Sequence, residues 1–228
     1  MNRRSRRARS VAHTMSIALL AITASFSGPS VPAAHAEPQD CLQATPAATA
    51  IQRTGGIVRV DVLVLVDGPT LSTAATVMNQ AATAYSRLGI DIHSHLQAAS
   101  LSGKTSSALH DEAKALLQGE RPPGIEAVLV MTTTLEDASA ADCIGGIRYR
   151  DHGFATSKYD DRSARNAIVA AHELGHVFGA HHHYANCIEG VSHEGSTLCT
   201  VMLPIRGALR FSTLNGMIVR GHVEQFAS

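Results

Sequence analysis

From residue 57 onward, the hydrophobic positions of the chain follow strand and helix periods in turn. Apolar, largely β-branched runs predict buried strands, an apolar–polar alternation predicts a half-buried strand, and apolar residues at helical spacing predict amphipathic helices. On these criteria the predicted strands are 57–66, 90–96, 125–132 and 153–159, and the predicted helices are 71–87, 106–118, 164–178 and 212–226. Strands that alternate with helices indicate an α/β fold. The histidine of the second helix, His110, is expected on its surface.

The first 36 residues have the pattern of an export signal. Five arginines lie within the first nine residues, an apolar run at 16–26 follows, and Ala34-His35-Ala36 has the small-x-small form of a cleavage site. The apolar run is too short to span a bilayer, so we expect cleavage and export, with a retained membrane anchor as the alternative. The general secretory and twin-arginine routes both stay open. Residues 37–56 are predicted to be a linker rich in Ala, Pro and Thr, and 57–228 a single domain.

The charge balance and the cysteines both fit an exported protein. Cleavage removes five of the 19 Lys and Arg residues and none of the 19 Asp and Glu residues, which leaves an excess of five acids. Such a chain has no electrostatic reason to bind nucleic acid or an anionic membrane. Four cysteines allow three disulfide pairings. We expect Cys187 with Cys199, which would tie the segments that flank the candidate metal site below, and this leaves Cys41 with Cys143.

The candidate chemistry lies at the end of the 164–178 helix. His172 and His176 are four residues apart, so they share one helix face and can bind a single ion. Glu173 follows His172 directly on the helix. Its carboxylate can reach a water on the metal and act as a base, but it is poorly placed to be a ligand. Gly179 allows the chain to reverse through a left-handed conformation and deliver a third imidazole, His182. Its neighbours His181 and His183 are also histidines, and only the family spacing described next selects the middle one.

The pattern His172-Glu173-x-x-His176-x-x-Gly179-x-x-His182 resembles the motif of the metzincin zinc endopeptidases. Cys199-Thr200-Val201-Met202 also resembles the turn whose methionine lies beneath the zinc ligands in that family. The resemblance implies an α/β (α+β) domain with a twisted mixed sheet of about five strands, an active-site helix and a C-terminal helix. It also implies a secreted, monomeric enzyme that binds Zn²⁺ through the three histidines, uses Glu173 to activate a zinc-bound water, and hydrolyses internal bonds of extended polypeptides.

Two further expectations come from this resemblance. Pro204 replaces the tyrosine that adds a metal contact in the astacin and serralysin branches, so the reprolysin (adamalysin)-like branch fits better, although His183 stands where reprolysins often have aspartate. The glycine-rich segment 143–150 resembles the metzincin edge strand that pairs with substrate, because glycines tolerate the close approach of another backbone. The residues predicted to contact substrate are Ile144, Gly145, Gly146 and Ile147, with an ordinary flexible edge as the alternative.

Two alternatives to this reading of the site stay open. The chain can be a secreted zinc-binding protein without peptidase activity, although the glutamate at position 173 has no use in a storage site. Cys41 can act as a latency cysteine that blocks the metal, because some metzincin precursors use a thiolate in this way. The short stretch between the cleavage site and the first strand leaves little room for a folded pro-segment, which argues against latency.

Overall fold

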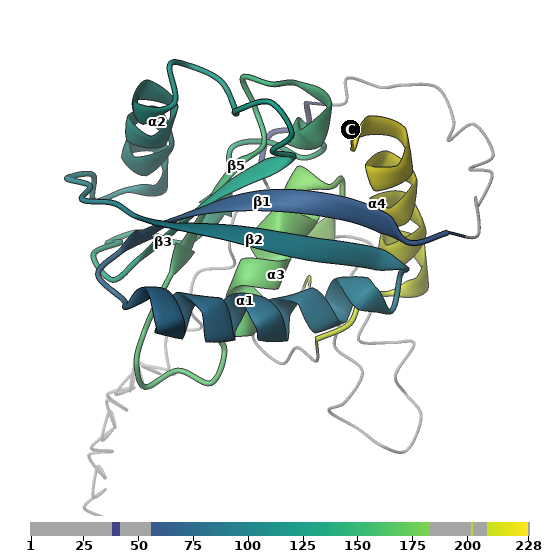
Figure 1. The fold of residues 1–228 in the computed structure, drawn as a ribbon, viewed down its shortest axis with the longest axis horizontal. Coiled ribbons are helices and arrows are strands. Elements are labelled where there is room, and N and C mark those ends of the chain that lie inside the picture. Colours follow the sequence, from purple (N-terminus) through teal and green to yellow (C-terminus); the bar gives the residue numbers. More distant parts are fainter. Residues whose placement is uncertain (1–37, 42–55, 183–201, 203–208, 228) are drawn as a thin grey trace, which may run out of the picture. The chain divides into compact units, whose positions relative to one another are not determined.

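The computed structural model describes residues 38–41, 56–182, 202 and 209–227 (Figure 1). The predicted strands and helices in these ranges are confirmed to within a few residues at each end. In chain order the elements are β1 (Val58–Asp67), α1 (Leu71–Ser86), β2 (Ile90–Ala98), α2 (Ser106–Leu116), β3 (Ala127–Thr132), β4 (Ala140–Ala141), the 3-10 helix η1 (Gly146–Arg148), β5 (Phe154–Lys158), α3 (Asn166–Val177) and α4 (Thr213–Phe226). Within the described ranges, none of these helices is long and apolar enough to cross a membrane.

The strands form one mixed sheet in the order β2-β1-β3-β5-β4. β2, β1, β3 and β5 run parallel to one another. The fifth strand of the sheet, β4, pairs with β5 in the antiparallel direction. Parallel neighbours need long crossovers, and α1 lies in the connection from β1 to β2 and α2 in the connection from β2 to β3. The α/β fold with a mixed five-stranded sheet that we expected is therefore observed in the described part of the chain.

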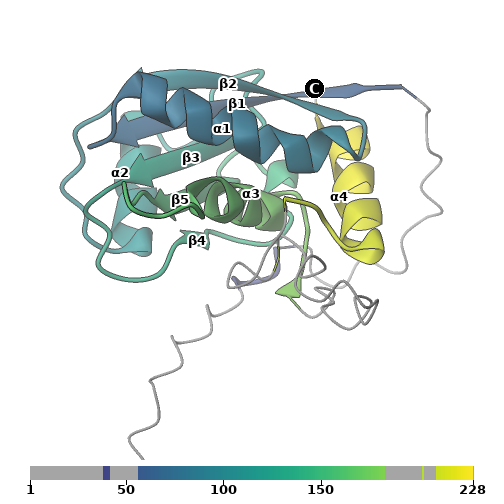
Figure 2. The same cartoon turned by 90° about the horizontal axis from the view of Figure 1, so that it is seen from below.

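Helices cover the two faces of this sheet, and the alternation within β1 explains why both faces are apolar. Val60, Val62 and Val64 point into a core shared with α1, α3 and α4, whereas Leu63 and Leu65 point into a second core beneath α2. Seen from below, α1 and α3 lie side by side over the first face (Figure 2). A continuous apolar strand is what burial on both faces requires.

The glycine-rich segment 143–150 does not form the predicted edge strand, and this corrects one of our expectations. Gly145 has a φ of 75°, a left-handed conformation that ends any extended run, and η1 begins at the next residue. A Cβ on Gly146 would lie 2.6 Å from the backbone nitrogen of Gly153, so its glycine is required by the chain's own loop. The edge strand is instead β4, only two residues long.

The backbone of Ile144, predicted to contact substrate, is already paired within the chain. Its N–H donates to the carbonyl of Gln39 at 2.8 Å, and its carbonyl accepts from the N–H of Cys41 at 3.1 Å. The N–H of Gly145 donates to the carbonyl of His176 at 2.8 Å, and the side chains of Ile144 and Ile147 are buried in the protein. The four residues Ile144, Gly145, Gly146 and Ile147 therefore do not offer the free strand edge that substrate pairing needs.

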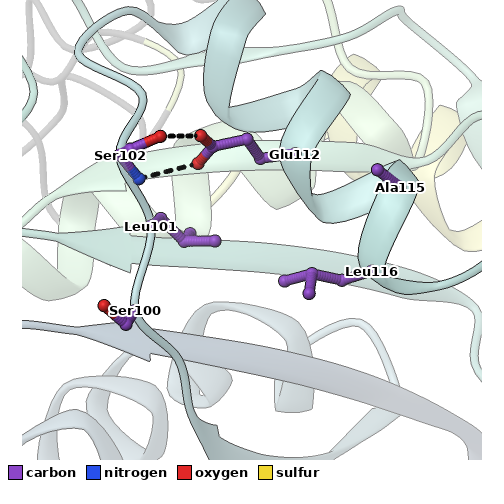
Figure 3. A pocket seen from close by; sticks show the side chains of 6 residues that line it. All are labelled: Ser100, Leu101, Ser102, Glu112, Ala115 and Leu116. Carbon is purple, nitrogen blue, oxygen red and sulfur yellow. Dashed lines mark hydrogen bonds between the residues drawn. The ribbon is translucent and has the colours of Figure 1, made fainter.

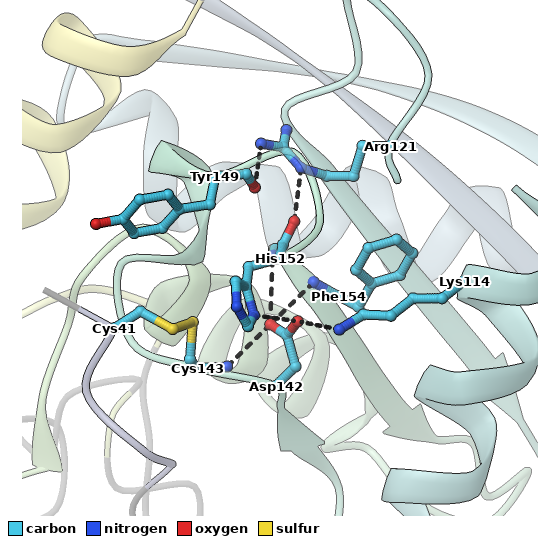
Figure 4. Close-up of a disulfide and its surroundings, with 9 residues drawn as sticks. Cys41, Lys114, Arg121, Asp142, Cys143, Tyr149, His152 and Phe154 are labelled. Atoms are coloured by element: carbon cyan, nitrogen blue, oxygen red, sulfur yellow. Dashed lines mark hydrogen bonds and ion pairs between the residues drawn. A yellow bond between two sulfur atoms is a disulfide. The ribbon is translucent and has the colours of Figure 1, made fainter. Parts of the chain in front are cut away.

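A buried arginine holds the same loop against the body of the domain. The Arg121 guanidinium donates to the carbonyls of Tyr149 and His152 at 3.1 and 2.7 Å (Figure 4). It also donates to the carbonyl of Ile147 at 2.8 Å. Its desolvation lowers the pKa of the guanidinium from its usual value. Hydrogen bonds to several carbonyls offset the cost of burying the charge, and they tie the loop to Arg121.

The disulfide predicted by elimination, Cys41 with Cys143, is confirmed (Figure 4). It ties segment 38–41 to the beginning of the glycine-rich loop, next to the buried carboxylate of Asp142, which accepts from the N–H of Cys143 at 2.9 Å. The other predicted bridge, Cys187 with Cys199, lies outside the described residues. The observed bridge closes a loop with a sequence separation of 102 residues, so it restricts the unfolded chain strongly.

Replacing both cysteines of this bridge by serine is expected to destabilise the fold by about 3–5 kcal/mol, because a loop of this length loses much conformational entropy on cross-linking. Urea unfolding followed by circular dichroism measures the change in the free energy of unfolding. Replacing both residues, and not one alone, avoids leaving an unpaired thiol at position 41 or 143. An unchanged unfolding midpoint would show that the bridge does not stabilise the domain by restricting the unfolded chain.

Candidate metal centre

The helix α3 is positioned by buried contacts that leave one face for the histidines. Every residue from Ala170 to Ala180 is buried, and the helix packs against β3, β5 and α1. The hydroxyl of Tyr85, on α1, donates to the carbonyl of Ala171 at 2.7 Å. The helix starts at Asn166 after Arg165, whose side chain makes no capping bond, and so begins slightly later than the predicted start at 164.

The reversal after α3 has the hydrogen bonds of a Schellman motif. The N–H of Gly179 donates to the carbonyl of His176, and the N–H of Ala180 donates to that of Gly175, both at 2.8 Å. Gly179 has a φ of 94°, and a Cβ there would collide with the ring of His222. The glycine that predicted a reversal is therefore required by backbone conformation and by the packing of α4.

This reversal brings His182 to the two histidines of the helix. The Nε2 atoms of the three rings lie 3.0–3.2 Å apart in every pairing, so they form a nearly equilateral triangle. His172 and His176 are almost fully buried, and His182 is partly exposed. Within the described ranges, His181 does not join this group, and His183 lies outside those ranges.

The environment of His176 indicates which form its ring takes. Its Nδ1 lies 2.9 Å from the carbonyl of Ala180, so Nδ1 carries the proton and the Nε2 lone pair faces the other two rings. Burial, followed by the neighbouring His172 and His182, holds the pKa of His176 well below its usual value. The ring is therefore neutral, as a metal ligand must be.

A tetrahedral metal ion fits this arrangement. With Zn–N bonds of about 2.0–2.1 Å, two nitrogen ligands of one zinc ion are about 3.3 Å apart. The observed separations of 3.0–3.2 Å are close to that value. The three nitrogen lone pairs face one another, and they repel unless a cation lies among them. Sites with nitrogen ligands and no thiolates are typical of zinc ions that keep one coordination position open. The residues present therefore fit a zinc ion.

Glu173 lies beside this triangle and is also buried. One of its carboxylate oxygens, Oε1, is 3.9 Å from Nε2 of His172, too far for a hydrogen bond. Desolvation raises the pKa of Glu173 well above its usual value, and a hydrogen bond from the backbone of Ala141 acts in the opposite direction. Ala141 belongs to β4, so the edge of the sheet reaches the carboxyl group of the site.

Met202 is fully buried and lies against α3 at Gly175, which comes between the two helix histidines in the sequence. A Cβ on Gly175 would come within 2.9 Å of its Sδ atom and 3.0 Å of the ring of Phe211. Gly175 therefore lets the methionine and the aromatic ring approach the helix backbone. The contact is with the helix backbone at Gly175, and a position of Met202 beneath the three ligands stays a prediction.

Two other features of the described residues do not provide a metal or substrate site of the same kind. Cys41, Cys143 and His152 lie close enough to share an ion, but the two sulfur atoms form the disulfide and cannot act as thiolates (Figure 4). A hollow of about 390 Å³ beside α2, lined by Ser100, Leu101, Ser102, Glu112, Ala115 and Leu116, lies by the helix that covers the face of the sheet opposite α3 (Figure 3).

Sequence reasoning missed several residues that shape the site. Tyr85, Ala141, Asn215 and His222 all touch α3 or the turn after it through hydrogen bonds. The sequence marks Tyr85 only as an apolar position of the 71–87 helix. No sequence pattern marks the other three, because each acts through a contact between distant parts of the chain.

Comparisons with known proteins find only a limited similarity between this chain and any of them. No protein-family model matches the chain, and no curated protein matches it either. Among solved structures, archaemetzincin from Methanopyrus kandleri has 15% identity and a TM-score of 0.49, covering 76% of this chain and 99% of that one. Archaemetzincin from Archaeoglobus fulgidus, complexed with malonate, has 14% identity and a TM-score of 0.43, covering 70% and 99%. Myroilysin has 10% identity and a TM-score of 0.36, covering 70% and 71%.

These identities and TM-scores do not assign the chain to a family, and they do not single out a reprolysin-like branch. The function therefore has to be inferred from the residues of the site.

Proposed function

We propose that this protein is a secreted zinc-dependent endopeptidase of the metzincin type that hydrolyses internal peptide bonds of extended polypeptides. One observation carries the proposal: three imidazole Nε2 atoms converge at 3.0–3.2 Å, and a buried carboxyl group lies beside them. A storage site needs the nitrogen donors but not the acid. The reprolysin-like branch and the monomeric state remain expectations from the sequence motifs.

His172, His176 and His182 would hold the zinc ion. A bound zinc ion supplies a Lewis acid that polarises a carbonyl group and lowers the pKa of water toward neutrality. The protein's own contribution begins with the Nδ1–H of His176, whose hydrogen bond to the Ala180 carbonyl fixes the orientation of the ring. The helix fixes His172 one turn earlier, and the glycine reversal brings in His182.

Glu173 is the general base of the proposed reaction. Its buried carboxylate takes a proton from the attacking water and donates it to the departing amine, which leaves the carboxylate ready for another cycle. Burial raises its pKa, so the carboxyl group can hold the proton between these two transfers. The Ala141 backbone hydrogen bond restrains the carboxyl group beside His172.

A peptide bond is the substrate that this combination suits best. Its hydrolysis needs a polarised carbonyl, an activated water and a proton for the leaving amine, and the site offers a group for each. Residues 203–208, which follow Met202 in the chain and on which bond preference would depend, lie outside the described ranges. The proposal therefore names extended polypeptides as a class and no particular sequence.

Digestion of casein with and without a zinc chelator tests the proposal. We expect internal fragments in mass spectra, loss of cleavage with 1,10-phenanthroline, and recovery when zinc is added back, because the three histidines would hold the Lewis acid that polarises the scissile carbonyl. Stoichiometric zinc without any cleavage would favour the alternative of a zinc-binding protein. Cleavage that persists after the metal has been removed and its absence verified would contradict the proposed mechanism.

A further inference from the structure

The turn that carries the third histidine is held by one face of α4. Asn215 and His222 are seven residues apart, so two helical turns place them on the same side of α4. Nδ1 of His222 lies 3.1 Å from the carbonyl of Phe178, the last residue before the glycine reversal. Asn215 contacts the other end of the turn, at His181. Together they hold both ends of residues 178–181.

The contact of Asn215 is bidentate. The backbone N–H of His181 donates to Oδ1 of Asn215, and Nδ2 of Asn215 donates to the carbonyl of His181, each at 2.9 Å. Asn215 has no exposed surface, so neither group is accessible to water. The backbone of Asn215 itself is fixed, because its N–H donates to Oγ of Ser212, the N-cap of α4, at 3.2 Å. The amide therefore replaces both hydrogen bonds that the backbone of His181 would otherwise make to solvent.

The third ligand needs such support more than the other two. His172 and His176 are placed by the geometry of α3, which fixes their rings relative to each other. His182 comes two residues after the Schellman motif, beyond the last helical hydrogen bond. Its Nε2 must nevertheless meet the other two at 3.0 and 3.1 Å. Holding the preceding residue by both backbone polar groups restricts the directions that the next side chain can take.

We propose that Asn215 is a positioning residue for the metal centre: its amide fixes the backbone of His181 and thereby directs His182 toward His172 and His176. This inference rests on the proposed function only in that the three histidines bind a metal. Asn215 touches neither the metal ligands' donor atoms nor the reacting groups. It acts through His181, and its effect is on the affinity for zinc.

Zinc affinity, measured by competition with a chromophoric chelator, tests the inference. Asn215→Ala is expected to weaken zinc binding by about 10–100-fold, the loss typical when a residue that orients a ligand is removed. The matched control is Thr105→Ala, which removes the N-cap of α2 on the opposite face of the sheet and lowers the thermal midpoint without touching the turn. Its zinc affinity should equal that of the wild type. Equal affinities in wild type and in folded Asn215→Ala would overturn the inference.

Asn215→Asp serves if the alanine variant does not fold. The side chain has the same shape, but an oxygen replaces the Nδ2 donor and faces the carbonyl of His181, so zinc affinity should again fall by at least tenfold. Wild-type affinity in this variant would overturn the inference. A wild-type protein that binds zinc but does not cleave casein refutes the proposed peptidase activity and leaves the positioning role intact. The two proposals therefore fail on different measurements.

Discussion

Replacing Glu173 by Gln is expected to leave zinc binding within a few-fold of the wild type and to slow casein hydrolysis by about 10²–10⁴-fold. Glutamine keeps the shape of the side chain, but its amide cannot take a proton from water and return it to the leaving amine. The three Nε2 atoms lie on other residues, so the metal site itself is unchanged. Turnover rates with fluorescently labelled casein, together with zinc content, separate these two effects.

A second buried glutamate provides the matched control for that substitution. Glu126 is 4% exposed and lies just before β3, where its Oε2 accepts from the N–H of Asp61 at 2.7 Å. Glu126→Gln removes the same charge from a comparably buried position outside the histidine group, so catalytic turnover should be retained by the folded variant. Normal turnover in Glu173→Gln, or an equal loss in both variants, would refute the role of Glu173 as the base.

The regular elements of this fold could be predicted because their residues repeat with the period of the structure. In β1, alternate valines and leucines face two different cores, and this accounts for a continuous apolar run. The ends of the helices were also marked locally: Thr70 and Ser212 each accept a hydrogen bond from the N–H three residues later. Such signals need no knowledge of which segments meet in space.

The spacing of the histidines could be interpreted for the same reason. One helical turn fixes the relation of His172 to His176, and a glycine with a φ of 94° marks the reversal before His182. The sequence alone could not choose among three consecutive histidines without the family spacing. The structure brings His182 into the group because the Schellman motif and the Asn215 contact set the direction of the chain.

The errors all involve contacts between residues that are distant in sequence. The glycines at 145 and 146 indicated a close backbone approach, but the partner is the loop at Gly153 and the strand position at Ile144 is taken by segment 38–41. His110 was expected on the surface, yet it is 7% exposed and its Nε2 lies 3.2 Å from the carbonyl of Ala140. No periodicity in a single sequence identifies such partners.

The choice among the three consecutive histidines leads to the second prediction with a large expected effect. Losing a residue that only orients a ligand typically weakens metal binding by about 10–100-fold. His182→Ala should weaken zinc binding by more than this, because it removes one of the donor atoms. Hydrolysis should fall with the metal content. His181→Ala keeps the backbone N–H and carbonyl that Asn215 binds, so it is the matched control and should retain zinc. His183→Ala, outside the described ranges, should also retain it. Loss of zinc in either control, with normal binding in His182→Ala, would mean that a neighbouring histidine supplies the third nitrogen.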